Sequence, residues 1–187
     1  MIVIEVKKLI KSDLFRYYAN QKPNFVRRTQ LYGFKYTKIL RKAHYYKKHN
    51  KIMFMLYGYL LNRLQLKYGY QISISATIGR GLYLCHLGTV IVNPDVVIGD
   101  NVNLNHNITI GQTNRGTNKG APIIGNKVWI GTGAVIVGKI QIGDDVLIAP
   151  NSYVNVDVPS HSVVVGNPAV IHHRENATQG YIENTIK

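Results

Sequence analysis

The stretch Ile124–Val154, IGNKVWIGTGAVIVGKIQIGDDVLIAPNSYV, decides the fold of this 187-residue chain. An aliphatic residue stands at every sixth position: Ile124, Ile130, Ile136, Ile142, Ile148 and Val154. A period of six fits neither an α-helix, which repeats every 3.6 residues or so, nor a free β-strand, which alternates every second residue. It is typical of short strands joined by tight turns and wound into a coil, with one residue of each edge pointing inward.

The same period runs upstream, through Ile72, Ile78, Leu84 and Val90 and again through Ile98, Leu104 and Ile110. Two residues are inserted between Val90 and Ile98, and the polar stretch 112–122 interrupts the pattern a second time. Because this stretch cannot supply inward-facing aliphatic residues, we expect it to leave the coil as a loop. The pattern predicts a mainly β fold, a parallel β-helix with about 18 residues per turn and roughly five turns.

Three segments are predicted along the chain. Residues 1–70 form a basic helical N-terminal region, in which Ser12 and Asp13 are candidate helix caps. Within it, residues 38–49 are expected to form a basic helix and residues 52–66 a more apolar helix that packs against another element. Residues 71–171 form the β-helix domain, and residues 172–187 form a polar C-terminal tail.

The net positive charge of the chain arises in its N-terminal segment. The chain has a formal net charge of +14, and residues 1–70 contain 16 of its 23 Lys and Arg against Glu5 and Asp13 alone. Ten of the 13 tyrosines also lie there. Such a segment suits peripheral attraction to an anionic membrane leaflet, contact with an acidic polysaccharide, or a solvated helical cap on the coil. We expect no nucleic-acid partner, because no recognised nucleic-acid-binding module is present.

Cysteine content and hydropathy indicate the compartment. Cys85 is the only cysteine, so no intrachain disulfide can form and a reducing compartment is favoured. The N-terminus lacks the layout of a signal peptide. The longest apolar stretch, Ile52–Leu61, is well short of the roughly 20 residues that a transmembrane helix needs. We expect a cytoplasmic protein, and the inner face of the membrane is one of the alternatives for its basic segment.

Four short motifs identify the coil segment. They are ATIGRGL at 76–82, His86 followed by GTVIVN at 88–93, VWIG at 128–131 and GNPA at 166–169. With them, Tyr68–Ile171 resembles the hexapeptide-repeat acyltransferases, chiefly serine acetyltransferases and the related acetyltransferases of bacterial surface-polysaccharide clusters. The resemblance implies a left-handed parallel β-helix, a homotrimer with sites between subunits, and acetyl-CoA as co-substrate.

His86 matches the catalytic histidine of that family. An alcohol is a poor nucleophile while it keeps its proton, and imidazole can accept a proton near neutral pH. We therefore expect His86 to deprotonate the acceptor as it attacks the thioester, with backbone N–H groups of nearby glycine turns stabilising the oxyanion. His106 also stands two places after an aliphatic anchor, so it should stack on His86. It either borders the same pocket or is an ordinary surface position of the coil.

The resemblance also suggests residues for coenzyme A. Glycine-rich turns would leave room for the thin pantetheine chain, Trp129 either walls the site or packs between subunits, and Asn167 and Pro168 belong to the family's closing loop. Cations would meet the phosphates. The candidates are Gly111, Gly131, Thr132, Gly133, Trp129, Asn167, Pro168, Lys127, Lys139 and Arg174. We expect no metal, because the chain lacks a second histidine five residues from His106.

Three departures from serine acetyltransferases bear on the acceptor. That family has an aspartate before its catalytic histidine, where this chain has Cys85, another aspartate at the position of Gln71, and a second histidine near Ala121. Loss of the carboxylates disfavours the ammonium group of serine and favours a neutral sugar hydroxyl. The sequence therefore predicts an acetyl-CoA O-acetyltransferase that modifies a glycan, a surface polysaccharide or its precursor. The alternatives are a serine O-acetyltransferase and a non-catalytic hexapeptide-repeat scaffold.

Overall fold

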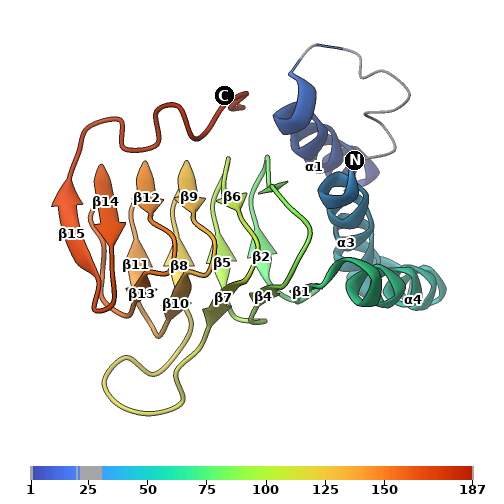
Figure 1. Ribbon diagram of the computed structural model, residues 1–187. Coiled ribbons are helices and arrows are strands. Elements are labelled where there is room, and N and C mark those ends of the chain that lie inside the picture. The colour runs from blue at the N-terminus through green and yellow to red at the C-terminus, as the bar shows by residue number, and fades with distance from the viewer. Residues whose placement is uncertain (1, 20, 22–30, 187) are drawn as a thin grey trace.

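The computed structural model describes residues 2–19, 21 and 31–186 and shows a β-helix with helices at one end (Figure 1). The helices are α1 (Ile2–Tyr18), α3 (Tyr32–His49) and α4 (Lys51–Tyr68). Asn50 separates the last two and caps α4, because its side chain accepts a hydrogen bond from Met53 N at 2.9 Å. Gly69, at φ 83°, ends α4 in a left-handed conformation and starts the coil.

The coil has three parallel faces, which confirms the predicted β-helix. Sheet A contains β1 (Tyr70–Ile72), β4 (Val90–Val92), β7 (Ile108–Gly111), β10 (Val135–Val137) and β13 (Tyr153–Val154). Sheet B contains β2 (Thr77–Ile78), β5 (Val97–Ile98), β8 (Ile123–Ile124) and β11 (Gln141–Ile142). Sheet C contains β3 (Tyr83–Leu84), β6 (Asn103–Leu104), β9 (Val128–Ile130), β12 (Val146–Ile148), β14 (Ser162–Val165) and the antiparallel β15 (Val170–His173).

The hexapeptide register accounts for the core. Leu84, Leu104, Ile130 and Ile148 are paired in successive strands of sheet C and are at most 2% exposed. Stacking these side chains removes their apolar surface from water without any long strand. Residues 112–122 leave the coil as a loop, as expected, and backbone hydrogen bonds between Thr113 and Gly120 close it. Of the six aliphatic positions that define the repeat, Ile124 to Val154, all are buried.

Ser12 and Asp13 are not helix caps, because α1 continues through both to Tyr18. Both side chains instead bind the first coil. The Ser12 hydroxyl accepts a hydrogen bond from Gly81 N at 3.1 Å, and Asp13 Oδ1 accepts one from Leu82 N at 2.9 Å. A polar pair in the middle of a helix thus satisfies the backbone N–H groups of the coil turn on which the helix lies.

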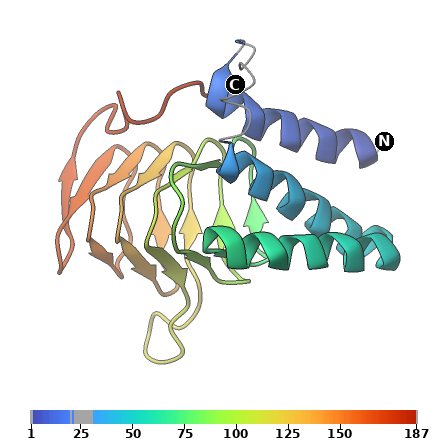
Figure 2. The ribbon, with the colours of Figure 1, turned by 45° about the vertical axis from the view of Figure 1, so that its right-hand side comes forward.

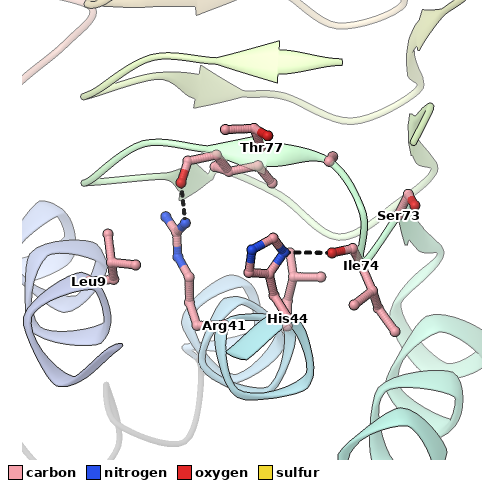
Figure 3. A pocket seen from close by; sticks show the side chains of 9 residues that line it. Leu9, Arg41, His44, Ser73, Ile74 and Thr77 are labelled. Atoms are coloured by element: carbon pink, nitrogen blue, oxygen red, sulfur yellow. Dashed lines mark hydrogen bonds between the residues drawn. The ribbon is translucent and has the colours of Figure 1, made fainter. Parts of the chain in front are cut away.

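Arg41 and His44, from α3, complete this junction (Figure 3). Arg41 forms a bidentate ion pair with Asp13, with both N–O distances 3.0 Å, and donates to the carbonyl oxygens of Ile78 and Gly79. His44 Nδ1 lies 2.7 Å from Ile74 O. The side chains beside this junction line a cavity of about 100 Å³, which is too small for a coenzyme. The junction therefore fixes the helices to the β-helix.

The C-terminal tail runs back along the outside of the coil toward α1 (Figures 1 and 2). Ala177, Thr178 and Ile182 are buried against it. Asn103 Nδ2 donates to Tyr181 O at 3.1 Å, and Asn101 exchanges two hydrogen bonds with the backbone of Ile186. Side chains from successive coils therefore hold the tail as a strap, a feature that its polar sequence did not indicate.

Asp145 is the main anchor of this strap. Its carboxylate, 4% exposed, accepts hydrogen bonds from Ala177 N, Thr178 N and Thr178 Oγ1 and lies 3.0 Å from His161 Nδ1. Burial alone would raise the pKa of Asp145, but the hydrogen bonds from Thr178 and His161 and the charge of Lys127 lower it to about 2. The contacts of the folded tail therefore stabilise the ionised carboxylate.

Replacing Asp145 by asparagine should lower the free energy of unfolding by about 2 kcal/mol at neutral pH, because a depressed pKa is stabilisation by the charged form. This contribution is present above about pH 4, the ordinary range of an aspartate, and is lost as pH falls toward 2. Urea unfolding across pH and protease cleavage within 174–186 measure both effects. Asp95→Asn, an exposed aspartate elsewhere, is the control, and equal losses in the two variants would contradict the anchor role.

Candidate active site

The turns that lead from sheet C to sheet A form one edge of the β-helix, which we call the His86 corner. His86, His106 and Thr132 each stand two residues after a paired position of sheet C, namely Leu84, Leu104 and Ile130. The register therefore stacks the three side chains on successive coils. The rings of His86 and His106 lie 5.7 Å apart, centroid to centroid, with an interplanar angle of 89°.

The two histidines differ in their surroundings. His86 is exposed, whereas His106 is half-buried. Among the described residues, His106 Nδ1 is buried and has no hydrogen-bond partner. A proton on that nitrogen would be a buried donor without an acceptor, so the arrangement favours the tautomer with its proton on Nε2. His106 thus presents a donor at its accessible nitrogen, while His86 keeps its ring open to a substrate.

Two further residues fix this geometry. The Tyr70 hydroxyl donates a hydrogen bond to His86 O at 2.9 Å, which holds the backbone of the turn. Gly88, at φ 134°, makes room for the second ring, because a Cβ at this position would lie 2.9 Å from His106 Cβ. Sequence reasoning missed Tyr70, since a tyrosine at the start of a strand carries no signal of this contact.

The predicted glycine donors are engaged elsewhere. Gly88 N donates to Tyr68 O, Gly131 N to Ile148 O and Gly133 N to His106 O, at distances of 2.8 to 3.2 Å. These N–H groups hold neighbouring coils together and are not free to bind an oxyanion. The expectation that these nearby glycine turns supply the oxyanion donors is therefore wrong for these three residues.

The remaining candidate residues lie on different edges of one protomer. Gly131, Thr132 and Gly133 share the His86 corner, and Asn167 and Pro168 form the turn between β14 and β15. Gly111 and Lys139 lie at the A-to-B edge, where the loop leaves the coil, since Gly138 N donates to Gly111 O. Lys127 lies at the B-to-C edge, with Nζ 3.8 Å from Asp145 Oδ1. One protomer does not bring all of these residues together.

Trp129 and Arg174 have partners within the chain. Trp129 lies half-buried on β9, and its ring meets that of Tyr181 from the tail at 4.9 Å between centroids. Arg174 follows β15 with an exposed side chain, and its backbone N donates to His161 O at 2.7 Å. Neither role predicted for Trp129, as a wall of the site or a contact between subunits, anticipated its cover by the tail.

Cys85 does not have the character of a nucleophile. It precedes His86 in the turn and is half-buried beside Arg16, and burial raises the pKa of its thiol to about 12 despite that cation. A thiol of this kind remains protonated at neutral pH. Among the described residues, no three His, Cys, Asp or Glu side chains are placed to hold a metal ion.

The coil and its histidine corner define a hexapeptide-repeat transferase. Residues 121–155 match the family described as bacterial transferase hexapeptide (six repeats). A serine acetyltransferase of Helicobacter pylori is 41% identical over 101 residues, covering 54% of this chain and 59% of the relative. The chain spans between 31% and 59% of the length of the curated relatives that it matches.

Solved structures extend the match over the helices. The Brucella abortus serine acetyltransferase in complex with coenzyme A is 31% identical, with a TM-score of 0.76 over 91% of this chain and 69% of that one. The Neisseria gonorrhoeae enzyme in complex with serine is 30% identical, with a TM-score of 0.73 over 89% and 69%. The chain belongs to the serine acetyltransferase family.

The predicted sugar acceptor is contradicted by these matches. The curated relatives and the solved structures above are serine acetyltransferases, and one of those structures contains serine. The prediction gave most weight to the missing carboxylates at Cys85 and Gln71. Two substituted positions proved weaker evidence about the acceptor than the similarity of the whole coil together with its helices.

Proposed function

We propose that the chain is an acetyl-CoA-dependent serine O-acetyltransferase. The observation that carries the proposal is the exposed His86 ring, which makes an edge contact with the His106 ring at a corner whose backbone Tyr70 holds in place. Relatives of the same fold have been solved with coenzyme A and with serine, which supports both substrates.

The proposed step is direct transfer. An imidazole nitrogen of His86 takes the proton of the serine hydroxyl while the oxygen attacks the thioester carbonyl. The tetrahedral intermediate collapses, the C–S bond breaks, and the CoA thiolate leaves with the proton returned by the imidazolium. The ring of His106 lies 5.7 Å from that of His86, and its Nε2–H would bind the oxyanion or the acceptor.

We propose that the site is completed between protomers of a homotrimer. The candidate residues for coenzyme A lie on different edges of the β-helix, and packing an edge of one protomer against a face of the next would bring them together. The single free cysteine suits a reducing, cytoplasmic setting. Among the described residues, no helix is long and apolar enough to span a bilayer.

Thiol release from acetyl-CoA tests the function. The full chain should release CoA in the presence of L-serine and much more slowly without it. Release that does not depend on serine would contradict the acceptor, and no release with any hydroxyl compound would favour a non-catalytic scaffold.

The absence of the family's carboxylates should affect the KM for serine rather than kcat. Gln71 is exposed on β1, at the position of the family's aspartate, so its replacement by aspartate should restore a charge for the serine ammonium group. We expect Gln71→Asp to lower the KM for serine about tenfold, the effect of one interaction of about 1.4 kcal/mol. Gln141→Asp, exposed on β11, is the control. An equal change in both variants would contradict the assignment.

A further inference from the structure

Helix α4 presents an apolar stripe that no described part of the chain covers. Ile52, Met55, Tyr59 and Leu66 are 59% to 80% exposed, and Leu56 and Leu60 are also exposed. Their spacing of three or four residues places them on one side of the helix. The opposite side carries the buried Leu61 and Tyr68 and packs on α3 and β1.

Cations accompany this stripe. Lys51, Arg63 and Lys67 of α4 are exposed, and Lys47 and Lys48 end α3 just before the turn into α4. Neither helix contains an aspartate or a glutamate, and the segment 14–94 contains none either. An apolar stripe with cations and no anions is the composition of a helix that lies in the interface of an anionic membrane.

The charge of α4 favours an anionic lipid surface over a second copy of the chain as the partner of the stripe. Two α4 stripes facing each other would bring lysines and arginines of the same sign together without carboxylates to pair them, which is unfavourable. An anionic lipid surface provides both apolar contact and opposite charge. The helices lie at one end of the β-helix with α4 on the outside of the group, so a flat surface can reach it (Figures 1 and 2).

We propose that α4 docks the protein on anionic phospholipid surfaces, with its apolar stripe in the headgroup region and its cations at the phosphates. The C-terminal end of α4 adjoins the His86 corner, since Gly88 N donates to Tyr68 O at 3.2 Å. A docked helix would therefore hold this corner close to the membrane surface.

Vesicle co-sedimentation of the full chain tests the proposal. We expect binding to vesicles of phosphatidylcholine with phosphatidylglycerol, and at least about tenfold weaker binding to phosphatidylcholine alone, because each cation contributes about a fivefold factor near such a surface. Met55→Gln/Leu56→Gln should weaken binding at least about tenfold, since it removes apolar area without changing charge. Lys51→Gln/Arg63→Gln/Lys67→Gln should weaken the preference for the anionic lipid, because it leaves only Lys47 and Lys48 of these cations.

Val156→Gln/Val165→Gln is the matched control, because it replaces two exposed apolar residues of the coil. It should bind like the unmodified chain. Circular dichroism and unfolding midpoints should remain unchanged in the α4 variants, whose substituted side chains are exposed. Equal binding to both kinds of vesicle, or unaltered binding of Met55→Gln/Leu56→Gln, would overturn the proposal. The proposal would also be overturned if the unmodified chain did not bind vesicles and Met55→Gln/Leu56→Gln had a lower oligomeric state. That result would identify the stripe as a protein interface.

Discussion

Replacing His86 by alanine is expected to lower kcat for acetyl transfer to serine by about 10²- to 10⁴-fold, the usual contribution of a positioned general base. The ring is exposed, and its contact with His106 is a ring edge contact rather than a hydrogen bond within the core. The fold should therefore survive the substitution. Steady-state thiol release together with circular dichroism measures both quantities.

His49→Ala provides the control for the loss of a histidine. His49 is exposed at the end of α3, where its ring Nδ1 lies 2.7 Å from Tyr45 O. This variant should retain the unmodified kcat. A His86→Ala protein that is folded and keeps half of its turnover would show that the acceptor is deprotonated by another group.

Replacing Arg41 by alanine is expected to lower the free energy of unfolding by about 3–5 kcal/mol, because it leaves Asp13 as a buried carboxylate without its cation. Asp13 is fully buried and Arg41 is 6% exposed. Burial raises the pKa of Asp13, and Arg41 opposes that rise through charge and hydrogen bonds. Arg41 also binds two backbone carbonyls of the first coil, which would lose these donors.

Arg80→Ala is the matched control for this ion pair. Arg80 and Asp100 also pair, at 2.7 Å, but their side chains are 48% and 26% exposed. The loss should therefore be below about 1 kcal/mol. Urea unfolding at one fixed protein concentration compares the two variants, since assembly would make stability depend on concentration. Equal losses would contradict the view that the buried pair holds the helices to the coil.

The repeat could be read from the sequence because each inward position carries the same physical demand. Ile130 and Ile148 stack on one another, so each must be aliphatic and must recur at fixed spacing. The same arithmetic predicted that His86 and His106 would meet on one edge, since a side chain two places after its anchor keeps that offset in the next coil.

Contacts between distant segments could not be read in this way. Local sequence predicts a helix cap at Asp13, but its partner Arg41 is 28 residues away and the contact depends on how α1 crosses α3. The tail sequence is polar, yet Thr178 is buried because Asp145 of a distant coil accepts its hydrogen bonds. A single sequence shows no period that links such residues. Local propensity and composition therefore predict a helix cap at Asp13 and a polar tail, and not the contacts that these residues make.

The predicted sugar acceptor was also wrong, because a few substituted positions say little about the substrate class. Removing one carboxylate changes the affinity for an ammonium group by about a factor of ten to a hundred, which does not define a different substrate class. In the proposed enzyme, the fold and the histidine corner set the reaction, and the charged positions around this corner adjust the affinity for the acceptor.

The most direct test of the account is to follow an isotopically labelled acetyl group. The full chain should transfer label from acetyl-CoA to L-serine, giving O-acetylserine detectable by mass spectrometry, and His86→Ala should give almost none. Labelled O-acetylserine formed at similar rates by both proteins would contradict the role of His86. CoA release without labelled serine would contradict the acceptor itself.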